Sequence, residues 1–139
     1  MLASMAEAIT EVRQPRHRSI VLIGHSGGGT LAVLLAPRIE DVSGVVSIAA
    51  NLDIDAWADH HNYDRLTGSL NPNSQPTDSA IPHEQMVGLR DQSVPVDTVS
   101  SYAEERPSVN FTVFEDFDHI CCWERDWPAI LETVAKGAP

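Results

Sequence analysis

The sequence has few basic residues and no long apolar run, and each absence argues against a class of function. There are 9 Lys and Arg residues against 20 Asp and Glu residues, giving a formal net charge of −11 at pH 7. This balance disfavours nucleic acid and anionic membranes as partners, because both are negatively charged. No apolar run approaches the ~20 residues of a membrane span, and the N-terminus lacks the basic and apolar segments of a signal peptide. We therefore expect a cytoplasmic protein that binds neither nucleic acid nor membrane.

Cysteine is also scarce, because Cys121 and Cys122 are the only two and they are adjacent. Neighbouring Cα atoms lie about 3.8 Å apart across a trans peptide bond, below the roughly 4.4–6.8 Å that is usual for a disulfide. We therefore expect two free thiols, packed behind the loop that carries His119 rather than acting as nucleophiles. Free thiols favour a reducing compartment.

A short glycine-rich segment, Gly24-His25-Ser26-Gly27-Gly28, is the most informative part of the sequence. An apolar run precedes it and a helix-like run follows it, which predicts a buried strand, a sharp turn and a helix. Positions two before and two after the centre of such a turn crowd each other, so we expect Gly24 and Gly28 to relieve a clash. This G-x-S-x-G pattern predicts a nucleophile elbow, with Ser26 as nucleophile and the Gly27 N–H as an oxyanion donor. We expect His25 to pack near the elbow without a catalytic role.

A serine nucleophile needs a base and an acid that orients the base, and both types of residue follow predicted strands. His119 comes shortly after the strand-like run 109–114, and Asp91 comes shortly after the apolar pair Met86-Val87. The carboxyl ends of parallel strands share one edge of a sheet, where ligands bind. We therefore predict a Ser26–His119–Asp91 triad.

Alternatives remain open for two members of this triad. The residue His119 could instead be a packing histidine beside Trp123. Rival acids to Asp91 are Asp97, Asp116 and Asp118, of which Asp118 is the weakest because adjacent residues cannot easily pair.

The remaining patterns predict an α/β fold with a parallel sheet and helices on both faces. Apolar residues at helical spacing predict a helix over 1–14 that packs on the sheet, and another begins near Trp127. The continuously apolar run 45–50 is typical of a strand covered on both faces.

Residues 51–82 are rich in Asn, Asp, Pro, Gly and Ser, and predict a long loop or small cap. Its aromatic and apolar residues could line a substrate pocket or anchor the loop to the body; they are Trp57, Tyr63 and Leu66. Its acidic and histidine residues have no metal-site spacing, so we expect solvated side chains and no metal; they are Asp53, Asp55, Asp59, His60 and His61.

Three motifs together resemble the α/β-hydrolases, most closely a bacterial serine esterase-like group. They are a GxSGGG elbow at 24–29, a GxxDxxVP acid loop at 88–95 and a DHxCCW histidine loop at 118–123. The order Ser, Asp, His along the chain is that of α/β-hydrolases. The resemblance covers nearly the whole chain and implies a hydrolase of ester-like acyl bonds that needs neither metal nor organic cofactor.

The resemblance also implies that 1–139 form a single partial domain, the C-terminal part of the fold from the elbow strand onward. The N-terminal strands of the family, and with them the second oxyanion donor, have no counterpart here. We therefore expect impaired catalysis and an exposed strand edge at 20–23 that promotes self-association. Two alternative functions stay open: a non-catalytic binding module of the same fold, and an acyltransferase that uses the same triad.

Overall fold

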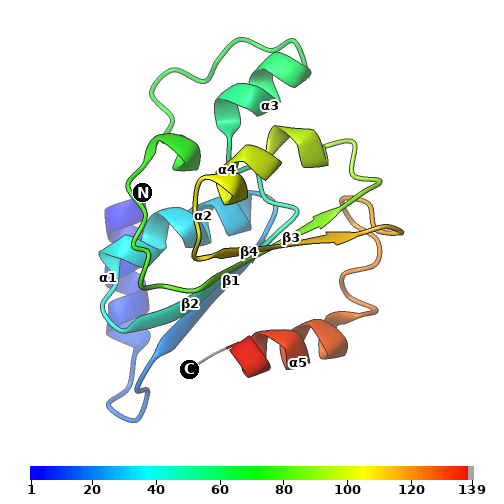
Figure 1. The fold of residues 1–139 in the computed structure, drawn as a ribbon. Coiled ribbons are helices and arrows are strands. Elements are labelled where there is room, and N and C mark those ends of the chain that lie inside the picture. Colours follow the sequence, from blue (N-terminus) through cyan, green and yellow to red (C-terminus); the bar gives the residue numbers. More distant parts are fainter. Residues whose placement is uncertain (138–139) are drawn as a thin grey trace.

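The computed structural model describes residues 1–137 and has a four-stranded parallel sheet at its centre (Figure 1). The strands occur in the spatial order β1-β2-β3-β4, which is also their order along the chain. Their bounds are β1 (Ile20–His25), β2 (Val42–Ile48), β3 (His83–Gly88) and β4 (Val109–Phe114). All three strand pairs are parallel, so the four carboxyl ends lie at one edge of the sheet.

Helices lie on both faces of this sheet, as predicted (Figure 1). Helix α5 lies on one face, whereas α2 and α4 lie on the other. The bounds are α1 (Leu2–Val12), α2 (Gly27–Leu35), α3 (Ile54–His60), α4 (Ser100–Glu104) and α5 (Trp127–Gly137), with 3-10 turns η1 (Ala36–Arg38), η2 (Pro72–Ser74) and η3 (Val96–Thr98). No helix within residues 1–137 is both long enough and apolar enough to cross a bilayer.

Strand β2 is apolar throughout its second half because both of its faces are covered. Val45 packs with Ala32 and Ala36 on the α2 side. Its neighbour Val46 points the other way and packs in the cluster that contains Ile130 of α5. The strand ends at Ile48, two residues before the predicted end, where the next residue adopts a positive φ of 46°.

The N-terminal helix forms as predicted but packs differently. Leu2, Met5 and Ile9 are only half-buried, Val12 is 74% exposed, and no residue of α1 is fully buried. Helix α1 contacts α2, which itself covers β1 and β2 on that face. Helix α1 therefore packs mainly on α2, and not on the sheet as predicted.

The segment 51–82 contains the short helix α3 and is fixed to the body by polar side chains. Asp53 caps α3 by accepting a hydrogen bond from the backbone N–H of Ala56 at 3.1 Å. The same carboxylate accepts from the amides of Asn71 (3.2 Å) and Asn73 (2.8 Å). Arg106 in turn donates to the side-chain oxygen of Asn73 at 2.9 Å. Within residues 1–137, no group of three or more His, Cys or acidic side chains is arranged to hold a metal ion.

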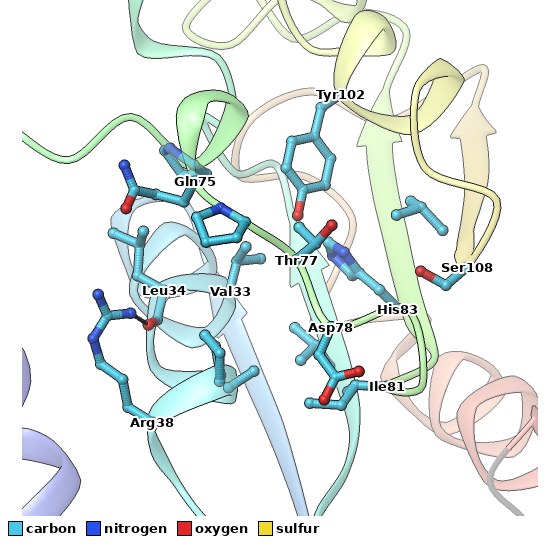
Figure 2. A pocket seen from close by; sticks show the side chains of 16 residues that line it. Val33, Leu34, Arg38, Gln75, Thr77, Asp78, Ile81, His83, Tyr102 and Ser108 are labelled. Atoms are coloured by element: carbon cyan, nitrogen blue, oxygen red, sulfur yellow. Dashed lines mark hydrogen bonds between the residues drawn. The ribbon is translucent and has the colours of Figure 1, made fainter.

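A buried histidine lies at the opposite end of the sheet from the carboxyl ends of the strands. His83 begins β3 and lines the pocket shown in Figure 2, with the ring of Tyr102 5.7 Å from its own. Its Nε2 lies 2.7 Å from the hydroxyl of Ser47, which is also buried. Burial, and secondly the positive charge of Arg106, lower the pKa of His83 from 6.5 to about 4.

We predict that this histidine makes the fold acid-sensitive. Because the folded state binds the proton less tightly than the unfolded state, the stability that His83 contributes is present above pH 6.5 and is lost as pH falls toward 4. The loss in the free energy of unfolding is about 3 kcal/mol. Urea denaturation at successive pH values measures it, with His83→Gln as the non-titrating variant and His17→Gln as an exposed-histidine control. An identical pH slope in His83→Gln and wild type would contradict the assignment.

Strand β1 is an edge strand with unpaired backbone groups along one side. Val21 and Ile23 alternate along it and are 36% and 41% exposed. Val21 lines a shallow hollow together with Val134 of α5, and Ile23 lines another together with Trp127 of α5. An edge strand with exposed apolar side chains is a template for pairing with another chain.

We predict that the chain self-associates through β1 at micromolar concentration and that Ile23→Lys, which places a charge on the edge, reduces this association. Sedimentation velocity over a concentration series measures the change. Val113→Lys is the control, because Val113 is similarly exposed at 38% but lies on β4, at the opposite edge of the sheet. A wild-type chain that stays monomeric at every concentration would refute the prediction.

Candidate active site

The turn between β1 and α2 places Ser26 in an unusual backbone conformation. Its φ is 53° and its ψ is −126°, a region that non-glycine residues seldom occupy. Such a conformation costs about 1–3 kcal/mol and persists only where the surrounding structure enforces it. Here the Ser26 N–H donates to the Ile48 carbonyl at the end of β2 (2.8 Å), and the Ser26 carbonyl accepts from the N–H groups of Gly29 and Thr30. The turn is thereby fixed, and the hydroxyl projects at the carboxyl end of the sheet.

Glycine is required in this turn at positions that differ in part from those expected. A Cβ on Gly24 would overlap the Gly28 backbone and lie 2.5 Å from the Gly29 nitrogen, so glycine is needed there. A Cβ on Gly28 would meet nothing within 4 Å, so the expected clash at that position is wrong. The second requirement falls on Gly29, where a Cβ would lie 2.6 Å from the Cβ of Ala50. The crowding therefore comes from the residues just after β2 as well as from the turn itself.

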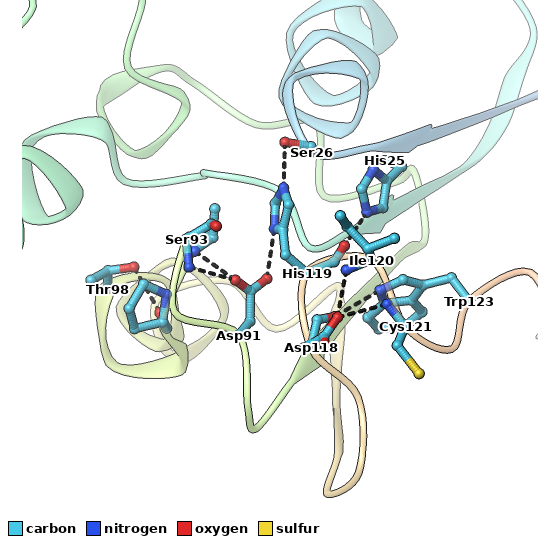
Figure 3. Close-up of polar contacts among 12 residues, drawn as sticks. His25, Ser26, Asp91, Ser93, Thr98, Asp118, His119, Ile120, Cys121 and Trp123 are labelled. Atoms are coloured by element: carbon cyan, nitrogen blue, oxygen red, sulfur yellow. Dashed lines mark hydrogen bonds and ion pairs between the residues drawn. The ribbon is translucent and has the colours of Figure 1, made fainter.

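The structure brings Ser26, His119 and Asp91 together in one chain of hydrogen bonds (Figure 3). The Ser26 hydroxyl lies 3.0 Å from Nε2 of His119, and Nδ1 of His119 lies 2.8 Å from Oδ2 of Asp91. Because a carboxylate only accepts, Nδ1 carries the ring proton and donates to Asp91. Nε2 is then the free lone pair and accepts from the Ser26 hydroxyl.

Asp91 is held as a buried acceptor with its hydrogen-bonding capacity used on both oxygens. Its side chain is 0% exposed, whereas that of His119 is 24% exposed. Oδ1 accepts from the backbone N–H groups of Ser93 and Val94, both at 2.8 Å, which leaves Oδ2 for His119. Satisfied hydrogen bonds of this kind are what make a buried carboxylate tolerable.

The rival acids are engaged elsewhere. Asp97 lies 3.8 Å from the ring of His60, and Asp116 bonds to Arg90 at 2.5 Å. Asp118 shapes the histidine loop itself, because its Oδ1 accepts from the backbone N–H groups of Cys121 (2.6 Å) and Ile120 (2.8 Å). These two hydrogen bonds lower the pKa of Asp118. Sequence reasoning missed this turn, although an Asp that begins a loop is a known signal for it.

The two cysteines form a disulfide rather than the expected free thiols. The expectation assumed a trans peptide bond, but the bond between Cys121 and Cys122 is cis, and their Cα atoms lie 3.1 Å apart. The bridge lies two residues after His119. The argument from free thiols to a reducing compartment therefore no longer holds.

An apolar pocket opens beside Gly27, between α2 and the segment that contains α3. Its volume is about 750 Å³. Among the three residues proposed for such a pocket, Trp57 and Leu66 line it, whereas Tyr63 stacks on the ring of His61 instead. Asn51 also lines it, and its buried Oδ1 has no hydrogen-bond partner. The other apolar lining residues are Met1, Leu2, Leu31, Leu34, Ile54 and Leu70.

The histidine loop crosses β3 in direct contact with its last residue. A Cβ on Gly88 would lie 2.7 Å from the carbonyl carbon of Phe117 and 3.2 Å from the carbonyl oxygen of Asp118. The N–H of Arg90 donates to that Phe117 carbonyl at 2.9 Å. The loops that carry Asp91 and His119 are therefore packed backbone against backbone at this point.

Solved structures with a similar fold include α/β-hydrolases and esterases. An esterase of Pyrococcus furiosus is 17% identical with a TM-score of 0.74, over 99% of this chain and 62% of the esterase. An α/β hydrolase from a sediment metagenome of the Mar Chica lagoon, Morocco, is 16% identical with a TM-score of 0.73, over 98% of this chain and 70% of the hydrolase. The esterase domain of a Rhodothermus marinus protein is 20% identical with a TM-score of 0.71, over 96% of this chain and 64% of the solved domain.

No family model matches the sequence, and no curated protein resembles it significantly in sequence. The chain spans about 62% of the length of a putative α/β hydrolase from Agrobacterium tumefaciens, with a TM-score of 0.67. The similarity is therefore one of fold, and it covers nearly all of this chain but only part of its neighbours.

We predict that Gly88→Ala lowers the free energy of unfolding by about 1–3 kcal/mol, because the new methyl group would push the histidine loop away from β3. Gly44→Ala is a matched control within β2, where a Cβ would make only ordinary contacts at 3.8 Å or more. That variant is expected to keep the wild-type stability or to gain up to about 1 kcal/mol. Chemical denaturation compares the two. Equal free energies of unfolding for the two variants would show that the histidine loop moves away from β3 without loss of stability.

Proposed function

We propose that this chain, which has the α/β-hydrolase fold, is a serine hydrolase that cleaves ester-like acyl bonds. The observation that chiefly supports the proposal is the unbroken chain of hydrogen bonds from the Ser26 hydroxyl through His119 to the buried Asp91. The hydroxyl, the imidazole lone pair and the carboxylate each have the orientation that acyl transfer requires. We assign Ser26 as nucleophile, His119 as general base and Asp91 as the residue that orients the base.

In the proposed reaction, Ser26 Oγ attacks the carbonyl carbon of the substrate while His119 Nε2 accepts the hydroxyl proton. The tetrahedral intermediate collapses when His119 returns that proton to the leaving alkoxide, which departs as an alcohol and leaves an acyl-serine. Water then attacks the acyl-serine with His119 again as base, and the carboxylic acid is released. Asp91 stabilises the imidazolium in both halves through its hydrogen bond to Nδ1.

The oxyanion formed in this reaction has one assigned donor, the backbone N–H of Gly27. Gly27 is exposed and begins α2, and the first N–H groups of a helix have no acceptor within it. The family supplies its second donor from the loop after an early strand, and residues 1–137 contain no strand before β1. Loss of one donor lowers turnover by about 10²–10³-fold. We therefore propose slow turnover by this chain on its own.

The pocket beside Gly27 supports an uncharged, apolar group as the part of the substrate next to the scissile carbonyl. Its side-chain lining is mainly aliphatic, with Trp57, three uncharged polar residues (Thr30, Asn51 and Ser69) and no charged side chain, so a charged group there would lose hydration without a side-chain counter-charge. Leu31 of α2 projects into it one turn after Gly27. We propose that this pocket receives the acyl chain.

The first experiment is intact-mass detection of a fluorophosphonate adduct on the purified chain, since this reagent needs an activated serine but no turnover. One adduct is expected on the wild type and on Ser79→Ala, an exposed serine outside the site. None is expected on Ser26→Ala. Absence of an adduct on a wild-type chain shown to be folded would overturn the proposed function.

A second experiment tests the pocket with p-nitrophenyl esters of increasing acyl length. Leu31→Trp should reduce kcat/KM for the longer esters about 10-fold or more relative to the acetate, because the indole fills the space that the added methylenes would occupy. Leu131→Trp, on the exposed side of α5, should leave the chain-length profile unchanged. A profile that Leu31→Trp does not alter would place the acyl chain elsewhere.

A further inference from the structure

His25 makes a contact that the proposed reaction does not use. Its Nε2 lies 2.6 Å from the backbone carbonyl oxygen of His119, and the two ring centroids are 5.1 Å apart (Figure 3). A carbonyl oxygen can only accept, so Nε2 of His25 carries the proton and donates. The residue immediately before the nucleophile is thereby bonded to the backbone of the residue assigned as base.

This contact ties the histidine loop to the last residue of β1, which no other hydrogen bond of the described residues 118–123 does. The hydrogen bonds of Asp118 to Ile120 and Cys121 are internal to the loop and set its shape. Asp91 holds Nδ1 and sets the direction of the ring. Neither determines how far the loop stands from β1, whereas the bond from His25 spans that gap.

Packing anchors the loop on both sides of His119 but not at the residue that follows it. Phe117 and Trp123 are buried in one core cluster, and the Trp123 indole N–H donates to the Asp118 carbonyl at 3.0 Å. Ile120, the residue after His119, is 81% exposed. The hydrogen bond at the His119 carbonyl therefore acts next to the part of the loop that packing does not hold.

We propose that His25 is a positioning residue, whose Nε2–H holds the His119 backbone so that Nε2 of His119 stays within reach of the Ser26 hydroxyl. The proposal rests on the proposed function of Ser26 and His119. His25 acts through His119 and does not touch the reacting atoms. A displacement of about 1 Å between reacting groups can cost about 100-fold in rate, so a contact remote from the substrate can still control turnover.

Two variants separate the hydrogen bond from the packing of the ring. His25→Phe keeps an aromatic ring beside His119 but has no donor, whereas His25→Gln has no ring but places an amide N–H near the position of Nε2. His17→Phe is the control, because His17 lies in an exposed turn before β1. Thermal melting of each variant establishes that it is folded.

With a p-nitrophenyl ester, His25→Phe should lower kcat by about 10–100-fold with KM nearly unchanged, because positioning acts on the chemical step. The His25→Gln variant should recover most of the activity, and His17→Phe should match the wild type. A His25→Phe variant with wild-type kcat, or a His25→Gln variant as slow as His25→Phe, would overturn the proposal.

A spectroscopic readout keeps this test independent of turnover. In ¹⁵N-edited NMR spectra, the Nδ1 proton of His119, held on Asp91, should give a slowly exchanging downfield signal in the wild type and in His25→Gln. The signal should broaden or disappear in His25→Phe. An unreactive wild type with this pattern would overturn the hydrolase assignment and retain the positioning role, whereas identical spectra in all three proteins would overturn the positioning role.

Discussion

Close packing of backbone against backbone at the carboxyl ends of the strands is the constraint on which the site depends. At the end of β1, Gly24 lies against Gly28 and Gly29 with no room for a side chain, and this contact allows the turn that presents Ser26. At the end of β3, Gly88 lies against the backbone of Phe117. The two contacts fix the nucleophile turn and the histidine loop to the same sheet edge, so that side chains 93 residues apart in sequence meet at hydrogen-bond distance.

The two ends of the sheet carry histidines in opposite environments. His119 lies at the carboxyl ends, partly open to solvent and beside a carboxylate, an arrangement suited to moving a proton. His83 lies at the amino end of β3, buried beside a guanidinium that disfavours its charge, and its role there is to fill space and bond to Ser47. Position in the sheet, rather than residue type, separates the candidate catalytic histidine from the structural one.

The sequence allowed the strands and the juxtaposition of Ser26, Asp91 and His119 to be predicted, because both follow from local signals. Apolar runs mark the strands, and polar residues just after them must lie at one edge when the strands are parallel. The contacts that could not be predicted depend on exact three-dimensional placement. The packing of α1 on α2 depends on which helix covers the sheet. The bridge between Cys121 and Cys122 depends on the isomer of one peptide bond. The hydrogen bond from His25 depends on the path of a loop 94 residues away.

The polar network around Asp53 has a consequence for how this chain would respond to a protease. Residues 62–70 are exposed throughout and offer a cleavage site. The segments on either side are tied together by hydrogen bonds. Asp53, just before α3, accepts from Asn71 and Asn73 beyond the exposed stretch. Arg106, which follows α4, donates to Asn73. A single cut there would therefore leave two fragments that remain assembled on the same sheet, and the wall of the apolar pocket would become a mobile end while the triad residues stayed in place.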